Sequence, residues 1–261
     1  MKRSQLILIL GAAVLAVVLF QLPRSVVENE QVQEVTETER HSMEIPQEVE
    51  NQINELRRLA QQEENIDKKA NFAHALANRY LDYAMLDSAE VYADLMMQWE
   101  LGSQELAADI YFKAYERSQD QNRAKEYALK ARSVLQQLLD KDPRNFAVKN
   151  RLAMTFVVSE NPMAGVAMLR EILTEDETNR QAILNLGLLA IQSGQFERAK
   201  ERFETLVSLD KSDHEAKLYL AVSMMEINKQ AQARLLLEEI LATQDSIPAI
   251  KMMASDYLKS L

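Results

Sequence analysis

Few residues of this sequence have the type and spacing that catalysis or metal binding requires. His41, His74 and His214 show no ligand-like spacing, and the chain has no cysteine, which excludes zinc–thiolate, iron–sulfur and thiol chemistry. Carboxylate pairs such as Glu238 and Glu239 are common, but on amphipathic helices they usually form the solvated face. No phosphate-binding loop, dinucleotide turn, nucleophile elbow or HExxH helix occurs. We therefore expect no catalytic, cofactor-binding or metal-binding residues and no enzymatic activity.

The composition predicts an almost entirely helical protein that does not bind nucleic acid. The 261 residues are 47% hydrophobic, enough for a sizeable core, and include only five glycines and five prolines. Turn-rich β folds and glycine-looped nucleotide folds need more of both. The net charge of −10 lacks the cationic footprint that phosphate recognition requires. One stretch, residues 113–151, is locally basic: it could meet an anionic surface, an acidic partner or the chain's own glutamates, or be a solvated helix face.

The N-terminus has the pattern of a membrane anchor. Lys2 and Arg3 precede an uninterrupted apolar run from Leu6 to Phe20, which as a helix is roughly 22 Å long. This is at the short end for a bilayer core of about 30 Å. A cleaved signal peptide is the alternative, but no Ala-x-Ala-like site follows Phe20. We expect residues 1–23 to be an uncleaved transmembrane signal anchor.

The charges around this run predict its orientation. Basic residues precede it, and the positive-inside rule therefore keeps the N-terminus in the cytoplasm and exports the remainder. The predicted location is the inner (cytoplasmic) membrane, crossed once, with the following domain periplasmic or otherwise extracytoplasmic.

An acidic segment and a leading helix are predicted next. Eight glutamates and one arginine occur from Glu28 to Glu50, so residues 24–46 form a disordered tether or carry a short linear motif for a partner. Residues 47–66 then predict an amphipathic helix with an apolar stripe. It either caps the following domain or pairs with a second copy as a short coiled coil; its length favours the cap.

The second half of the chain repeats with a period of 34 residues. Five columns of apolar or small residues recur three times without an insertion, and Pro162, Gly194 and Asn228 mark the breaks between two helices in each unit. Each unit is therefore two antiparallel helices that need small side chains where they approach closely. The columns are Leu152, Leu186 and Leu220; Ala153, Gly187 and Ala221; Gly165, Ala199 and Ala233; Leu169, Phe203 and Leu237; and Ile172, Leu206 and Ile240.

These units resemble the tetratricopeptide repeat family, in a membrane-anchored bacterial form. Residues 180–213 match best, with Leu186-Gly187, Gly194-Gln195-Phe196, Ala199 and Phe203 where the family pattern places them. The resemblance implies an all-α superhelix of about five helix pairs and a C-terminal capping helix, within residues 67–261. The expected repeats are 70–100, 101–145, 146–179, 180–213 and 214–247, with the cap at 248–260; the second holds about eleven extra residues, which lengthen its helices.

In this family the first helix of each pair lines the concave face and contacts partners. Transferring those positions onto this chain gives large apolar side chains in the third to fifth units, which suggests a trough for an apolar peptide or helix. The alternative is that neighbouring helices bury the trough themselves. The predicted partner-binding residues are Met154, Val157, Val158, Leu184, Leu188, Ile191, Leu218, Val222 and Met225.

The resulting functional hypothesis is a membrane-tethered adaptor that holds protein partners and assists the assembly or chaperoning of cell-envelope proteins. A self-associating structural scaffold without clients is the alternative. We expect the chain to contact protein partners and the membrane, and we do not expect it to bind nucleic acid. The sequence leaves open whether it forms homo-oligomers.

Overall fold

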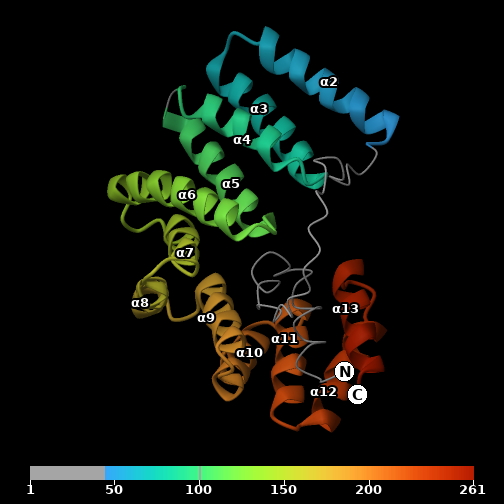
Figure 1. Cartoon of the computed structure of the whole chain (residues 1–261). Helices are drawn as coiled ribbons and strands as arrows, with labels where there is room; N and C mark the ends of the chain where they lie inside the picture. Colours follow the sequence, from blue (N-terminus) through green and yellow to red (C-terminus); the bar gives the residue numbers. More distant parts are fainter. Residues whose placement is uncertain (1–44, 100) are drawn as a thin grey trace, which may run out of the picture. The chain divides into compact units, whose positions relative to one another are not determined.

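The computed structural model describes residues 45–99 and 101–261. Within these ranges twelve helices and no strands form (Figure 1), and the chain divides into two compact units, before and after residue 135, with the boundary inside α6. The helices are α2 (Gln47–Gln62), α3 (Ile66–Asp82), α4 (Leu86–Met96), α5 (Leu101–Arg117), α6 (Gln121–Lys141), α7 (Phe146–Thr155), α8 (Pro162–Glu175), α9 (Arg180–Gln192), α10 (Phe196–Leu209), α11 (His214–Glu226), α12 (Gln230–Ala242) and α13 (Pro248–Lys259).

The first unit stacks its helices in chain order. α2 packs on α3, α3 on α4, and α5 on both α3 and α4. The narrow stripe of α2 buries Ile53 and Ala60, and Arg57 donates a hydrogen bond to the hydroxyl of Tyr80 on α3 at 2.7 Å. A single face of α2 therefore packs against α3.

Polar contacts between equivalent helices neutralise much of the basic stretch. Cations on α5 and α6 reach acidic or amide side chains that lie 33 to 36 residues earlier, on α3 and α4. The positive charges that the sequence concentrates after residue 113 therefore cross-link successive helix pairs. The contacts include Lys113–Asn78 (2.8 Å), Arg117–Asp82 (3.4 Å), Arg123–Glu90 (2.8 Å) and Lys130–Asp94 (3.0 Å).

In the second unit, each first helix begins at a repeated cap. Asn145, Asn179 and Asp213, spaced 34 residues apart, precede α7, α9 and α11. Each side-chain oxygen accepts a hydrogen bond from the backbone N–H three residues later, at 3.1, 3.1 and 3.0 Å respectively. Such caps satisfy N–H groups that the first turn leaves without partners. The 34-residue period therefore sets where each helix pair starts.

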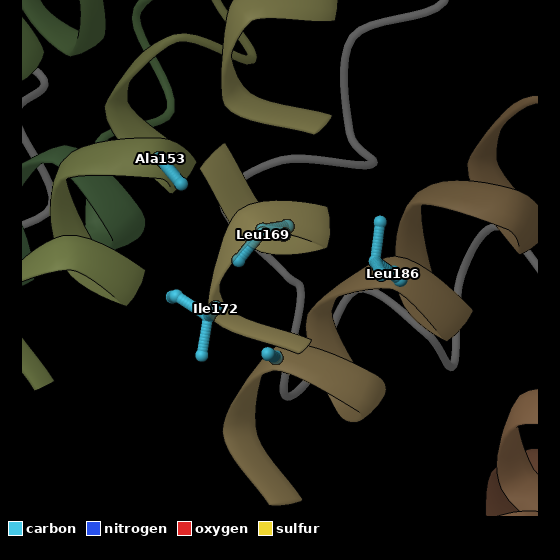
Figure 2. Close-up of a cluster of buried hydrophobic side chains, with 5 residues drawn as sticks. Ala153, Leu169, Ile172 and Leu186 are labelled. Atoms are coloured by element: carbon cyan, nitrogen blue, oxygen red, sulfur yellow. The ribbon is translucent and has the colours of Figure 1, made fainter. Parts of the chain in front are cut away.

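Small residues allow the two helices of a pair to approach closely. A Cβ atom on Gly165 of α8 would lie 2.3 Å from the carbonyl oxygen of Ala153 on α7. The neighbouring core cluster draws Ala153 from α7, Leu169 and Ile172 from α8, and Leu186 from α9 (Figure 2). Side chains of three successive helices thus share one apolar cluster, which joins the third helix pair to the fourth.

The predicted all-α fold of helix pairs followed by a final helix is confirmed over the described residues. The predicted anchor, residues 1–23, and nearly all of the predicted tether lie outside them. None of the helices in the described part of the chain is both long enough and apolar enough to cross a membrane.

Candidate partner-binding site

The nine predicted partner-binding residues lie on α7, α9 and α11 or directly after α7, but they differ in exposure. Five are buried: Leu184, Leu188, Ile191, Leu218 and Val222. The other four, Met154, Val157, Val158 and Met225, are half-buried. Met154 also packs against the core cluster of Figure 2. Val157, Val158 and Met225 therefore keep the solvent contact that a binding surface needs without a place in that cluster.

Helix α11 accounts for the deepest of these positions. Nine consecutive residues, from Ala216 to Met224, are buried, so α11 is covered on every side. A helix with one solvated face would instead alternate buried and exposed positions with a period of 3.6. Helices α9, α10, α12 and α13 all pack against α11. Leu218 and Val222, at 1% and 2% exposure, therefore offer a partner almost no surface in this structure.

Amide side chains on α7, on α9 and at the cap before α9 form a hydrogen-bond network in which Asn150 and Asn185 are buried. Asn150 of α7 donates to the Asn179 side-chain oxygen at 3.2 Å and accepts from the Asn185 amide at 3.4 Å. Gln181 donates to the Asn185 oxygen at 3.0 Å. These amides bind one another, so they connect α7 to α9 in the structure.

His74 and His214 belong to different units of the described chain. His74 of α3 is a half-buried residue whose Nε2 lies 2.8 Å from a carboxylate oxygen of Asp109 on α5, and Lys113 binds the same carboxylate oxygen at 2.7 Å. His214 begins α11 in the other unit, and His41 lies outside the described residues. No group of three or more histidine and carboxylate side chains in residues 45–99 and 101–261 is arranged to hold a metal ion.

One pocket in the second unit was not predicted from the sequence. Its volume is about 550 Å³, and it lies among the turn after α7, helix α8, the second half of α9 and the first half of α10. Val157 is the only predicted partner-binding residue among its lining residues, and Met163, Arg170, Arg198 and Arg202 of the second helices also line it. A signal was present: none of these three arginines has an acidic residue four positions away in the sequence.

Comparison with known proteins identifies the repeat. Residues 190–256, from the end of α9 into α13, match the family model for the tetratricopeptide repeat. This stretch is similar to the tetratricopeptide repeat family. The family resemblance drawn from the 34-residue period is thereby confirmed for this part of the chain. None of the curated proteins matches the chain in sequence.

Solved structures, among them two described as tetratricopeptide repeat proteins, share the fold at low sequence identity. A repeat protein from Parabacteroides merdae is 16% identical, with a TM-score of 0.55 over 81% of this chain and 82% of its own. The protein TTC0263 from Thermus thermophilus is also 16% identical, with a TM-score of 0.53 over 68% and 91%. BtubC from P. vanneervenii is 16% identical, with a TM-score of 0.52 over 80% of this chain and 89% of its own. These likenesses show the fold of stacked helix pairs.

Proposed function

We propose that this chain is a protein-interaction scaffold whose first helices hold an apolar peptide or helix of a partner protein. The observation that carries the proposal is that Val158 and Met225 remain half-buried, apolar side chains at predicted contact positions of two repeats. The tetratricopeptide fold supports it, since stacked helix pairs present extended surfaces suited to binding. Methionine adds to this surface because its flexible side chain adapts to varied partner shapes.

We further propose that the scaffold is tethered to the inner membrane and acts outside the cytoplasm, where it assists the assembly or chaperoning of envelope proteins. This proposal rests on the apolar run from Leu6 to Phe20, the basic residues before it and the acidic segment after it. In this arrangement residues 1–23 anchor the chain, residues 24–46 separate the repeats from the bilayer, and residues 67–261 hold the partner. A reporter that is active only outside the cytoplasm, fused after Leu261, should be active.

The binding proposal is tested with a double variant, Val158→Glu with Met225→Glu. Both side chains are half-buried, so the variant should keep its helicity. An apolar partner would then have to bury two carboxylates, and the cost of removing these charges from water should prevent binding. Leu188 is a poorer choice because it is buried, and a glutamate there would test folding instead. Chemical crosslinking in native membranes, followed by quantitative mass spectrometry, should show partner adducts that disappear in the double variant.

Met252→Glu is the matched control. Met252 is a methionine on α13 that is 60% accessible and is not one of the nine predicted partner-binding residues. Its adducts should equal those of the unaltered chain. Adducts that survive in the double variant, or disappear equally in the control, would exclude the predicted partner-binding residues as the partner site.

A self-associating scaffold without clients remains the alternative function. Size-exclusion chromatography with light scattering on the detergent-solubilised chain separates the two. A monomer at all concentrations supports the adaptor, whereas a large homo-oligomer that forms without a partner supports the structural scaffold.

A further inference from the structure

The pocket between α8, α9 and α10 combines an apolar floor with a cationic rim. Val166 of α8 and Leu189 of α9 line the pocket and also pack against the core cluster of Figure 2, to which Leu186, a third lining residue, belongs. The floor is therefore an extension of the fixed core and does not depend on mobile surface side chains. At the rim, Met163 is 61% accessible, so the apolar surface can be reached from solvent.

Three arginines of the rim give the pocket its charge. Arg170 comes from α8, and Arg198 and Arg202 come from adjacent turns of α10, so they face the pocket from two helices; Glu201 is the sole acidic lining residue. In a chain whose net charge is −10, this local excess of positive charge stands out. It produces a field that attracts anionic groups.

Two of these guanidinium groups have no ionic partner within the described residues. Neither Arg170 nor Arg202 forms an ion pair or a side-chain hydrogen bond there, whereas the basic residues of the first unit are extensively paired. Arg198 donates only to the amide oxygen of Gln195. Guanidinium groups bind carboxylates through two parallel hydrogen bonds, so Arg170 and Arg202 retain this capacity.

The rest of the rim suits a peptide backbone. Gln192 and Gln195 bring side-chain amides to the edge of the pocket, and the Gln192 amide forms no hydrogen bond with any residue of the described chain. An amide side chain both donates and accepts, as a peptide group does. A fatty acid would use the floor and one arginine, whereas a peptide can also hydrogen-bond to both amides and reach both arginines, so the lining favours a peptide.

We propose that this pocket is a second interaction site, which binds a short segment of a partner protein in which large apolar side chains are flanked by glutamate or aspartate. The apolar side chains contact Val166 and Leu189, and the carboxylates bind Arg170 and Arg202. Apart from Val157, none of the predicted partner-binding residues lines this pocket. A client segment that is both acidic and apolar therefore binds this pocket, while a purely apolar segment binds the predicted partner-binding residues of the first helices.

The test uses two labelled probe peptides and the purified full-length chain. One peptide has two leucines flanked on each side by two glutamates, and the other replaces every glutamate by lysine. Fluorescence anisotropy should show binding of the glutamate peptide, weakened by added salt because the rim is exposed, and no binding of the lysine peptide. Sodium dodecanoate serves as the competitor that represents a lipid carboxylate.

The double variant Arg170→Glu with Arg202→Glu reverses the charge of the rim. The variant removes two donors of charge-assisted hydrogen bonds and adds two like charges, so we expect the affinity for the glutamate peptide to fall at least about tenfold. Arg234→Glu, a charge reversal at an exposed arginine of α12 outside the pocket, should leave it unchanged. Circular dichroism confirms folding, and Met163→Glu, at an exposed rim position, provides a second variant that should also weaken binding.

Several results would overturn the proposal. Equal affinity for the lysine peptide, unchanged binding after reversal of both arginines, or an equal loss with Arg234→Glu would each exclude an acidic-peptide site here. Arginine-dependent binding of dodecanoate without binding of the peptide would assign the pocket to a lipid carboxylate. Val158→Glu with Met225→Glu should leave probe binding intact. This variant therefore distinguishes a loss of binding in the pocket from a loss of binding at the predicted partner-binding residues.

Discussion

Gly187 of α9 lies directly against the ring of Phe203 on α10, so that a Cβ atom at Gly187 would come within 2.6 Å of the phenylalanine Cζ. Phe203 is completely buried, and its ring also stacks on Tyr219 of α11, with ring centroids 5.5 Å apart. One phenylalanine therefore fills the space between the first helices of two successive repeats. The glycine at position 187 makes room for it.

We predict that Gly187→Ala destabilises the second unit. Overpacking of this kind costs about 1–3 kcal/mol, while the better helix propensity of alanine returns about 1 kcal/mol. Urea unfolding followed by circular dichroism measures the net loss. In a double-mutant cycle with Phe203→Leu, the double variant should lose less than the sum of the single losses. Simple additivity would show that the glycine is not required by the ring.

The sequence predicted the repeating part of this fold well for identifiable reasons. Pro162, Gly194 and Asn228 mark the breaks between the two helices of a pair, and such local signals are visible in a sequence. Gly165 and Gly187 recur in columns because close helix approach leaves no space for a larger side chain. Signals that act within one helix pair were therefore sufficient to predict the pairs.

The sequence left open which of the predicted positions the neighbouring helix pairs cover. Leu218 and Val222 have the helical position of a concave face, yet both are buried, because the period of one helix does not reveal what covers it. The pocket was missed for a similar reason. Arg170 and Arg202 belong to second helices of different repeats, 32 residues apart in sequence, and only the fold brings them to one pocket.

We predict that Ala84→Gly stabilises the chain. Ala84, in the turn between α3 and α4, has a φ of 56°, a left-handed conformation that costs a residue with a Cβ atom roughly 1–2 kcal/mol. Glycine removes this strain, but it also raises the conformational entropy of the unfolded chain, which offsets part of the effect. We expect the free energy of unfolding to rise by up to about 1 kcal/mol, measured by urea unfolding.

The reverse substitution provides the control. Gly194, in the corresponding turn of the fourth repeat, has a φ of 71°, and no atom lies within 4 Å of a Cβ placed on it. Gly194→Ala should therefore destabilise through the backbone alone. A loss with Ala84→Gly, or no loss with Gly194→Ala, would contradict this account.

We predict that Asn179→Ala costs more than Asn145→Ala, although both residues cap a first helix. Loss of a cap costs about 1 kcal/mol at either position. At position 179 the buried Asn150 amide also loses one of its two hydrogen bonds as donor and keeps the one to the Phe146 carbonyl, which adds up to about 1 kcal/mol. Thermal unfolding of the two variants measures the difference. Equal losses would show that the amide network contributes nothing beyond the cap.

We predict that Tyr219→Phe leaves stability unchanged or raises it by up to about 1 kcal/mol. The Tyr219 hydroxyl is buried and has no hydrogen-bond partner among the described residues, so its removal ends a desolvation cost while the ring can still stack on Phe203. Tyr80→Phe is the matched control, because it removes the hydroxyl that accepts a hydrogen bond from Arg57 and should lower stability. Thermal unfolding should rank the two variants in that order.

The buried tyrosines predict that the fold weakens in alkali. Burial raises the pKa of Tyr115, Tyr219 and Tyr257 above that of a free tyrosine, because the interior disfavours phenolate. The folded chain therefore keeps protons that the unfolded chain releases near pH 10. The stabilisation is fully present below that pH and is lost as the pH rises above it, since the free energy of unfolding falls wherever the folded state binds more protons. Urea unfolding at a series of alkaline pH values should show this decline, and Tyr219→Phe should make it shallower by removing one of the titrating groups. An unchanged slope would show that Tyr219 titrates alike in the folded and unfolded chains.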